Sequence, residues 1–211
     1  MKDKKKLRIL FIGNSHTYFN DMPATVADLA REERYDCEVT MIAHGGWFLA
    51  QHVQEPETRF NIMHGHYDYV VLQEHAHPFG PVEKYFDAVW NLDEWIQKAR
   101  AKTVIYMTWA KKDEPGMQPA MTAAHEQIAR ETDALLAPVG KEWWAFREEN
   151  PGVEMYAPDG QHASEYGSWF AAKHIWHTIQ TDLDADRRMM NPELEDYLED
   201  LECIEAFDYL T

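Results

Sequence analysis

The feature that most constrains the fold is an apolar run near the N-terminus that ends on a polar turn. Residues 7–12 are Leu-Arg-Ile-Leu-Phe-Ile, and Gly13, Asn14 and Ser15 follow directly. An apolar run of this length that stops at a Gly-Asn-Ser turn predicts a buried β-strand. The segment 23–34 then predicts a helix, because it begins with a proline, which is favoured in the first helical turn. Ser15 would therefore lie at the carboxyl end of a strand, where open α/β sheets place their ligand crevices.

Strand and helix patterns alternate along the rest of the chain, without an internal repeat or a linker. Further strands are predicted at 37–43, 67–73, 102–108 and 137–140, and further helices at 51–64, 83–101, 118–135, 142–149 and 165–181. This order of elements predicts an α/β fold, a three-layer α/β/α sandwich in which helices cover both faces of a five-stranded parallel sheet. All strands of such a sheet point the same way, so the loops after their carboxyl ends can meet at one site.

A polar turn in the second half of the chain carries the groups that a nucleophilic serine needs. Asp159 precedes His162 by three residues in the segment 156–162, Tyr-Ala-Pro-Asp-Gly-Gln-His. A serine hydroxyl becomes a nucleophile when a base takes its proton and a third group orients that base. Ser15, His162 and Asp159 would fill these three roles in acyl transfer. Two of them also have ordinary structural roles, because Ser15 suits a turn and Asp159 suits the tight Pro-Asp-Gly turn.

The early Gly-x-Ser turn and the late Asp-x-x-His turn together give the chain a family resemblance. The sequence resembles the SGNH hydrolase superfamily, also called GDSL esterases and lipases, from Leu7 to the helix after His162. It is most similar to a divergent bacterial branch whose serine block is Gly-Asn-Ser. The resemblance implies the flavodoxin-like strand order 2-1-3-4-5. It also implies that Ser15, Asp159 and His162 form the catalytic triad.

The resemblance further implies an oxyanion hole, in which N–H donors stabilise the negative charge that develops on the substrate carbonyl. The superfamily takes these donors from the serine, from a glycine after the second strand and from an asparagine after the third. Gly46, in the segment Ala-His-Gly-Gly at 43–46, matches the glycine, but Gln73 stands where the asparagine is expected. We therefore expect the Ser15 N–H, the Gly46 N–H and the Gln73 side-chain amide to be the three donors.

Three more residues are expected to line the cleft and bind substrate. Asn14 precedes the serine, Trp47 follows the matched glycine, and Trp109 follows the fourth strand. An indole ring at such a position would stack on the apolar face of a sugar or cover an acyl chain. The alternatives are structural, with Asn14 as a turn residue or as a hydrogen-bonding support for the serine loop, and with both tryptophans as core residues. His16 adjoins the nucleophile, but adjacent side chains diverge, so we expect it to shape the rim rather than act as the base.

These residues predict a serine esterase that hydrolyses short acyl esters, with acetyl groups on carbohydrates as the leading substrate class. The partner would be a small-molecule or carbohydrate ester. No cofactor is implied, because the triad handles its own protons. The carbohydrate part of the prediction rests on the resemblance to acetylesterases of the superfamily and on Trp47 and Trp109.

Three other classes of protein share some of these features. A noncatalytic flavodoxin-like module that binds a small molecule or a carbohydrate would keep the crevice, and Gln73 is its best argument. An α/β-hydrolase has the nucleophile elbow Gly-x-Ser-x-Gly, whereas Thr17 stands at the second glycine here. A metal-dependent hydrolase would use the His-x-His pairs at 64–66 and 75–77. The chain has no His-Glu-x-x-His motif and no cysteine ligand pair, so we expect no metal site.

Composition argues against several partners. The net charge of −17 disfavours binding to nucleic acid or to an anionic membrane surface. No apolar run approaches the roughly 20 residues of a membrane span, and the basic start at 1–6 lacks the long apolar region of a signal peptide. Cys37 and Cys203 are isolated, without metal-ligand spacing or a disulfide framework. These features predict a cytoplasmic protein.

The 211 residues predict one domain over 1–186, followed by an acidic segment over 187–211. Eight acidic residues and no lysine or arginine lie between positions 191 and 211. Four apolar residues recur there at helical spacing, namely Leu194, Tyr197, Leu201 and Ile204. We expect an amphipathic helix that packs on the domain or docks on a second subunit, which would make a homodimer.

Overall fold

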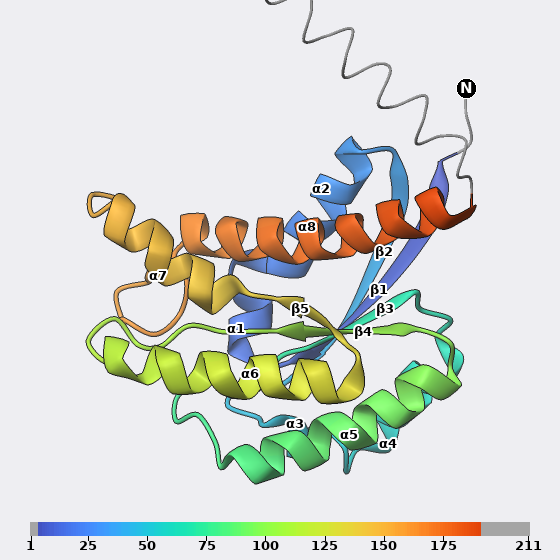
Figure 1. Ribbon diagram of the computed structural model, residues 1–211, viewed down its shortest axis with the longest axis horizontal. Coiled ribbons are helices and arrows are strands. Elements are labelled where there is room, and N and C mark those ends of the chain that lie inside the picture. The colour runs from blue at the N-terminus through green and yellow to red at the C-terminus, as the bar shows by residue number, and fades with distance from the viewer. Residues whose placement is uncertain (1–3, 191–211) are drawn as a thin grey trace, which may run out of the picture.

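The computed structural model describes residues 4–190, and a five-stranded sheet lies at its centre (Figure 1). The strands are β1 (Lys5–Gly13), β2 (Tyr35–Ala43), β3 (Tyr69–Leu72), β4 (Lys102–Tyr106) and β5 (Leu135–Ala137). Neighbouring strands are parallel throughout, in the order β2-β1-β3-β4-β5. The predicted α/β class is confirmed, as is the strand order that the family resemblance implied.

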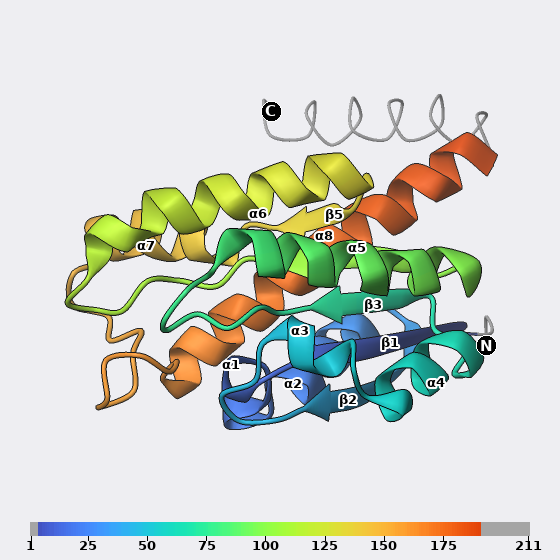
Figure 2. The ribbon, with the colours of Figure 1, turned by 90° about the horizontal axis from the view of Figure 1, so that it is seen from below.

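Helices cover both faces of the sheet, as the two views in Figures 1 and 2 show. One face carries α2 (Met22–Glu32), α7 (Val139–Glu149) and α8 (Glu165–Met190). The other face carries α3 (Leu49–His52), α4 (Pro56–His64), α5 (Val82–Lys98) and α6 (Gln118–Thr132). A short helix, α1 (Ser15–Tyr18), follows β1, and 3₁₀ turns occupy Phe19–Asp21 and Pro115–Met117.

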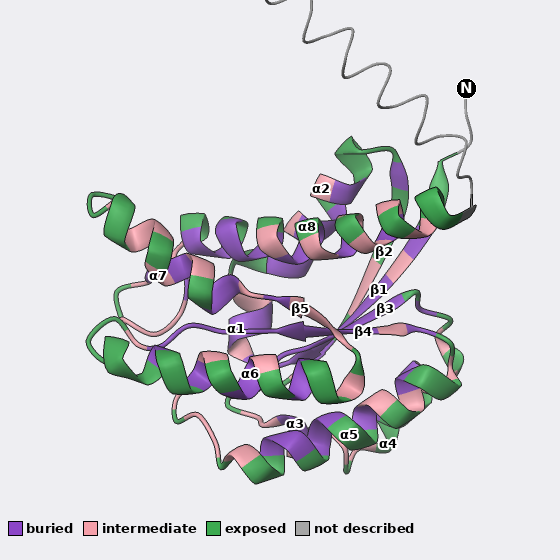
Figure 3. Cartoon of the chain, viewed as in Figure 1, coloured by how far each residue is buried: buried purple, intermediate pink, exposed green. Residues whose placement is uncertain are grey.

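The central strand β1 contributes to two separate cores. Its side chains alternate between the faces of the sheet, because successive Cβ atoms of a strand point to opposite sides. Leu7, Ile9 and Phe11 pack with α2 and α8, whereas Leu10 and Ile12 pack with α4 and α5. In Figure 3 the buried residues of the helices face the sheet. A strand that is covered on both faces can be apolar at nearly every position, which explains the continuous apolar run in the sequence.

The fifth strand is displaced from its predicted position. It occupies Leu135–Ala137 rather than 137–140. Pro138 has no backbone N–H to add to the sheet, and α7 begins at the next residue. A Cβ at Gly140 would lie 2.0 Å from the carbonyl oxygen of Thr108, so this helix start packs against the chain after β4 at a distance that only glycine allows.

The remaining expectations concern the helix at 51–64 and the C-terminal part of the chain. The helix predicted over 51–64 is two short helices, α3 and α4, separated by a turn. The expected domain boundary after residue 186 falls inside α8, which continues without a break to Met190. The acidic amphipathic helix predicted over 187–211 therefore lies almost wholly outside the described residues. Between residues 4 and 190, no helix combines the length and apolar character needed to cross a membrane.

Candidate active site

The end of β1 and the loop before α8 bring Ser15 and His162 together across 147 residues of sequence. Ser15 is the first residue of α1, and its Oγ lies 2.8 Å from Nε2 of His162. Nδ1 of the same imidazole lies 2.6 Å from Oδ2 of Asp159. A hydroxyl, an imidazole and a carboxylate in this order form the arrangement that nucleophilic catalysis by serine requires.

Asp159 is anchored by its own turn. Its Oδ1 accepts hydrogen bonds from the backbone N–H groups of Gln161, at 2.9 Å, and of His162, at 3.0 Å. Partial desolvation acts to raise the pKa of this carboxyl, but the hydrogen bonds from the His162 ring and the two N–H groups outweigh it and lower the pKa to about 2. The ionised carboxylate fixes a proton on Nδ1 of His162. Nε2 is thereby left as the acceptor for the Ser15 proton.

Trp109 supports the loop that carries Asp159 and His162, and it does not line the cleft as expected. The residue is completely buried, and its ring stacks on Trp143 at a centroid distance of 3.9 Å. Its Nε1–H donates a hydrogen bond of 2.9 Å to the carbonyl of Gln161, the residue before the base. The prediction that Trp109 contacts substrate is corrected accordingly, because the indole has no exposed surface to offer a ligand.

Two rings enclose the His162 imidazole. Phe19 stacks on it at a centroid distance of 4.2 Å with an interplanar angle of 13°, and His16 lies at 4.9 Å. Burial, and then the nearby His77 and His162, lower the pKa of His16 well below its ordinary value. His16 is therefore a neutral neighbour of the base. The sequence indicated that His16 shapes the site, but it gave no sign of the stacking by Phe19.

The Gln73 side chain stabilises the serine turn from its buried side. Its Oε1 accepts hydrogen bonds of 2.8 Å from the backbone N–H of Asn14 and from the Thr17 hydroxyl. Its Nε2 donates to the carbonyl of Glu74. A Cβ at Gly13 would lie 2.6 Å from Oε1, so the close approach of the glutamine requires a glycine there. This differs from the expectation that the amide faces the cleft, because the buried donors of the turn take up its oxygen.

The two backbone donors expected in an oxyanion hole are unoccupied. Within the described chain, neither the Ser15 N–H nor the Gly46 N–H donates a hydrogen bond to another group. Gly46 has a φ of +75°, a conformation that glycine adopts without strain. An exposed, left-handed glycine at this point leaves its N–H available to a ligand.

Asn14 and Trp47 join the serine turn to the Gly46 loop. Asn14 is almost fully buried, and its Oδ1 accepts from the His16 N–H at 3.0 Å. Its Nδ2 donates to the carbonyl of Trp47 at 2.8 Å. Both ends of the Asn14 amide are thus used inside the protein, so this residue supports the serine loop rather than contacting substrate. Trp47 is half-buried, and its ring is tilted against that of His44, with a centroid distance of 4.1 Å and an interplanar angle of 34°.

Glu74 is a residue of this region that the sequence analysis missed. It is 1% exposed, and its carboxyl accepts backbone N–H bonds from His75, at 2.7 Å, and from Leu49, at 3.3 Å. It therefore ties the loop after Gly46 to the loop after β3. Burial raises the pKa of Glu74 to about 7 despite these two bonds. The available signal was an acidic residue placed two positions after a continuous apolar strand.

The histidine pairs do not assemble into a metal centre. Among residues 4–190, no group of three or more histidine, cysteine, aspartate or glutamate side chains has the arrangement to hold a metal ion. His75 instead stacks on Phe48, and His77 lies beside His16.

Known structures share this architecture. A protein from Slackia heliotrinireducens described as an SGNH hydrolase is 32% identical, with a TM-score of 0.72, over 83% of this chain and 100% of that chain. The psychrotrophic esterase EstA from Pseudoalteromonas sp. is 15% identical, with a TM-score of 0.63, over 84% and 98% of the two chains. A catalytic mutant of the acetylxylan esterase Axe2 from Geobacillus stearothermophilus is 17% identical, with a TM-score of 0.65, over 85% and 96%. No protein-family model and no curated protein matches the sequence.

The Slackia protein establishes the family, because it matches over its whole length at 32% identity. The chain belongs to the SGNH hydrolases, and it is a serine hydrolase. The other two structures, at 15% and 17% identity, share the fold.

Proposed function

We propose that the protein is an esterase in which Ser15, His162 and Asp159 form the catalytic triad. One observation carries the proposal, the continuous chain of contacts from the Ser15 hydroxyl to His162, at 2.8 Å, and from His162 to Asp159, at 2.6 Å. A protein that only bound its ligand would have no use for a hydroxyl, a base and an orienting carboxylate in one line.

The proposed reaction has two halves. In the first, Ser15 Oγ attacks the ester carbonyl carbon while its proton passes to Nε2 of His162. The tetrahedral oxyanion then collapses, the bond to the alcohol breaks, and His162 returns the proton to the leaving alcohol. In the second half, water attacks the acyl-serine, gives a proton to His162 and releases the carboxylic acid, after which Ser15 regains its proton. Asp159 stays ionised throughout and stabilises the imidazolium form of His162.

The Ser15 and Gly46 N–H groups are the proposed oxyanion donors. Both point to no acceptor within the described chain, and loss of one such donor typically raises the barrier by about 2.7–4 kcal/mol. Gln73 acts one step behind them in this proposal, since it fixes the Asn14 N–H and thereby the position of the Ser15 N–H.

The proposed substrates are short acyl esters, with acetyl groups on carbohydrates as the leading class. Two observations support this choice. A protein of the same fold is an acetylxylan esterase, and the half-exposed Trp47 ring directly follows Gly46. An indole beside the oxyanion donor can stack on the apolar face of a sugar.

A second candidate is a noncatalytic module that binds a small molecule or a carbohydrate in the same crevice. The observation that favours it is the inward-facing amide of Gln73, which leaves the site one side-chain donor short of the family pattern. The assembled triad favours the esterase.

Hydrolysis of 4-nitrophenyl acetate tests the proposal. We expect turnover by the wild-type protein that EDTA does not change and that Ser15→Ala abolishes. Activity that survives in Ser15→Ala would contradict the triad, and loss of activity on chelation would indicate a metal-dependent hydrolase. Absence of turnover in both proteins, on acetylated sugars as well, would favour the binding module.

A further inference from the structure

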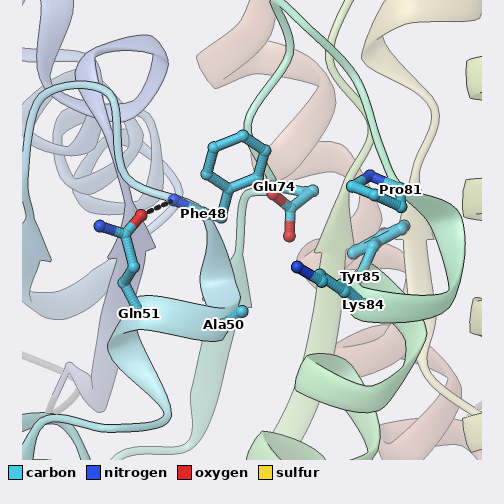
Figure 4. Close-up of a pocket in the computed structure, with 7 residues that line it drawn as sticks. All are labelled: Phe48, Ala50, Gln51, Glu74, Pro81, Lys84 and Tyr85. Carbon is cyan, nitrogen blue, oxygen red and sulfur yellow. Dashed lines mark hydrogen bonds between the residues drawn. The ribbon is translucent and has the colours of Figure 1, made fainter.

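A cavity lies beside the loop that follows Gly46. It has a volume of about 280 Å³, near the lower end of the roughly 300–1,000 Å³ typical of small-molecule sites. Three segments line it (Figure 4): the start of α3, the second residue after β3, and the start of α5. The lining residues are Phe48, Ala50, Gln51, Glu74, Pro81, Lys84 and Tyr85. None of the proposed triad residues is among them.

One wall of this cavity is formed by the loop that carries Gly46, one of the two proposed oxyanion donors. Phe48 comes two residues after Gly46, and its ring stacks on His75 at a centroid distance of 4.3 Å. The Gln51 side chain accepts a hydrogen bond from the Phe48 N–H at 2.9 Å and fixes the ring's position, as the dashed line in Figure 4 shows. The preceding carbonyl, of Trp47, accepts from the Asn14 side chain next to Ser15. A ligand in the cavity would thus lie against the same loop as a substrate at Ser15.

Glu74 supplies a hydrogen-bond acceptor to the cavity. An ionised carboxylate has about four acceptor positions, and the side chain uses two of them for the N–H groups of His75 and Leu49. No cationic side chain among residues 4–190 forms an ion pair with it. Its raised pKa, about 7, reflects burial without a compensating positive charge.

Lys84 supplies a donor on the opposite wall. It is exposed on the first turn of α5 and makes no ion pair within the described residues. In Figure 4 the amino group of Lys84 and the carboxyl of Glu74 face each other across the cavity, with the Phe48 ring beside them. The cavity therefore offers one acceptor, one donor and one aromatic face. The acceptor and the donor do not form an ion pair with each other.

We propose that this cavity binds a neutral, hydroxyl-rich ring, a sugar unit of the ester substrate next to the one that carries the scissile ester. The inference rests on the proposed esterase function. A hydroxyl can donate to Glu74 and a ring or hydroxyl oxygen can accept from Lys84, while the apolar face of the ring lies against Phe48. An anion would face the Glu74 carboxyl and a cation would face Lys84, so a neutral ligand suits both walls.

The direct test is titration of the ¹⁵N-labelled protein with methyl β-D-xylopyranoside, an unreactive sugar. We expect saturable amide shifts centred on residues 48–51, 74–75 and 84–85, and weaker binding to Lys84→Met. Absence of saturable shifts up to high millimolar sugar, or shifts centred elsewhere on the protein, would overturn the proposal. This measurement does not depend on catalysis.

Kinetics give a second readout. The ratio of kcat/KM for a monoacetylated methyl xylobioside to that for 4-nitrophenyl acetate is expected to fall about tenfold in Lys84→Met, the loss of one charged hydrogen bond of about 1.4 kcal/mol. The matched control is Lys98→Met, at the other end of α5, where the ammonium pairs with Glu94 in solvent and the ratio should hold. An unchanged ratio in Lys84→Met would overturn the sugar subsite.

The two proposals fail in different ways. If Ser15→Ala keeps its activity, the esterase mechanism fails whatever the sugar titration shows. If hydrolysis depends on Ser15 but neither the amide shifts nor the ratio responds at this cavity, the esterase stands and the sugar subsite fails.

Discussion

The serine turn and the acid–base loop meet at one hydrogen bond, but they are built in opposite ways. The serine turn is buried, and a side chain from a distant strand holds it: Asn14 is 1% exposed and its N–H donates to Gln73, 59 residues away. The acid–base loop is more open to solvent, and its carboxylate is held locally, since Asp159 is 44% exposed in its side chain and accepts hydrogen bonds only from its own turn, although Trp109 holds the Gln161 carbonyl. Catalysis and stability should therefore be separable in the loop and coupled in the turn.

The largest expected effect is a loss of activity caused by a substitution in the acid–base loop. His162→Ala should lower kcat for 4-nitrophenyl acetate about 10⁴- to 10⁶-fold, because removal of the base disables the whole triad. The free energy of unfolding should fall by only about 1 kcal/mol, because the main structural contact that is lost is the stack on Phe19. Kinetics and urea denaturation on one preparation measure both quantities. His177→Ala, on the exposed side of α8, is the control. A similar loss of activity in this variant would contradict the assignment of His162 as the base.

A change beneath the serine turn should affect stability and activity together. Gln73→Leu leaves the Asn14 N–H and the Thr17 hydroxyl buried without an acceptor, which should cost about 2–4 kcal/mol of unfolding free energy. The loosened turn should also lower kcat. Urea denaturation and steady-state kinetics measure the pair of effects, and Gln127→Leu on the solvent side of α6 is the control. Full stability in Gln73→Leu would show that the buried network does not hold the turn.

Trp109→Phe should produce an intermediate effect, because it removes a buried hydrogen bond that supports the loop. The variant keeps an aromatic ring against Trp143 but loses the hydrogen bond from Nε1–H to the Gln161 carbonyl. We expect a loss of about 1–3 kcal/mol in unfolding free energy, measured by urea denaturation, and a several-fold fall in kcat. Trp90→Phe on α5 is the exposed control. Lost stability with unchanged kcat would mean that Trp109 does not position the base.

The smallest effect is the pH dependence of stability at Asp159. The pKa of this carboxyl is lowered from about 3.9 in the unfolded chain to about 2, so its contribution is present above pH 4 and is lost as the pH falls from about 4 to about 2. Solvent screening at an exposed side chain limits it to below about 1 kcal/mol. The difference in unfolding free energy between wild type and Asp159→Asn, measured in urea, should shrink between pH 5 and pH 2.5. A constant difference would contradict the lowered pKa.

The same contrast explains what the sequence predicted. The strands follow from apolar runs, and the meeting of Ser15 with the Asp159 turn follows from the polarity of a parallel sheet, whose carboxyl ends share one edge. The bond between Asp159 and His162 is local, with two residues between the partners, so a short motif encodes it. These parts of the fold and the site depend on short-range patterns or on a general rule of topology.

What the sequence did not predict depends on tertiary packing. Gln73 could face the cleft or the turn, and the choice is made by the buried Asn14 N–H and Thr17 hydroxyl, which need an acceptor. Trp109 could cover a ligand or join the core, and the stack with Trp143, 34 residues further on, decides it. The role of Glu74 as a tie between two loops likewise depends on a partner, Leu49, that no local pattern indicates.

The measurement that tests the central claim most directly is labelling by a fluorophosphonate, which forms a covalent bond with an activated serine. Intact mass and peptide mapping identify the labelled residue. We predict one adduct per chain, located on Ser15 and absent in Ser15→Ala. The adduct should form at least about 100-fold more slowly in His162→Ala, because the base activates the hydroxyl. An adduct on another residue, or a labelling rate that His162→Ala leaves unchanged, would contradict it.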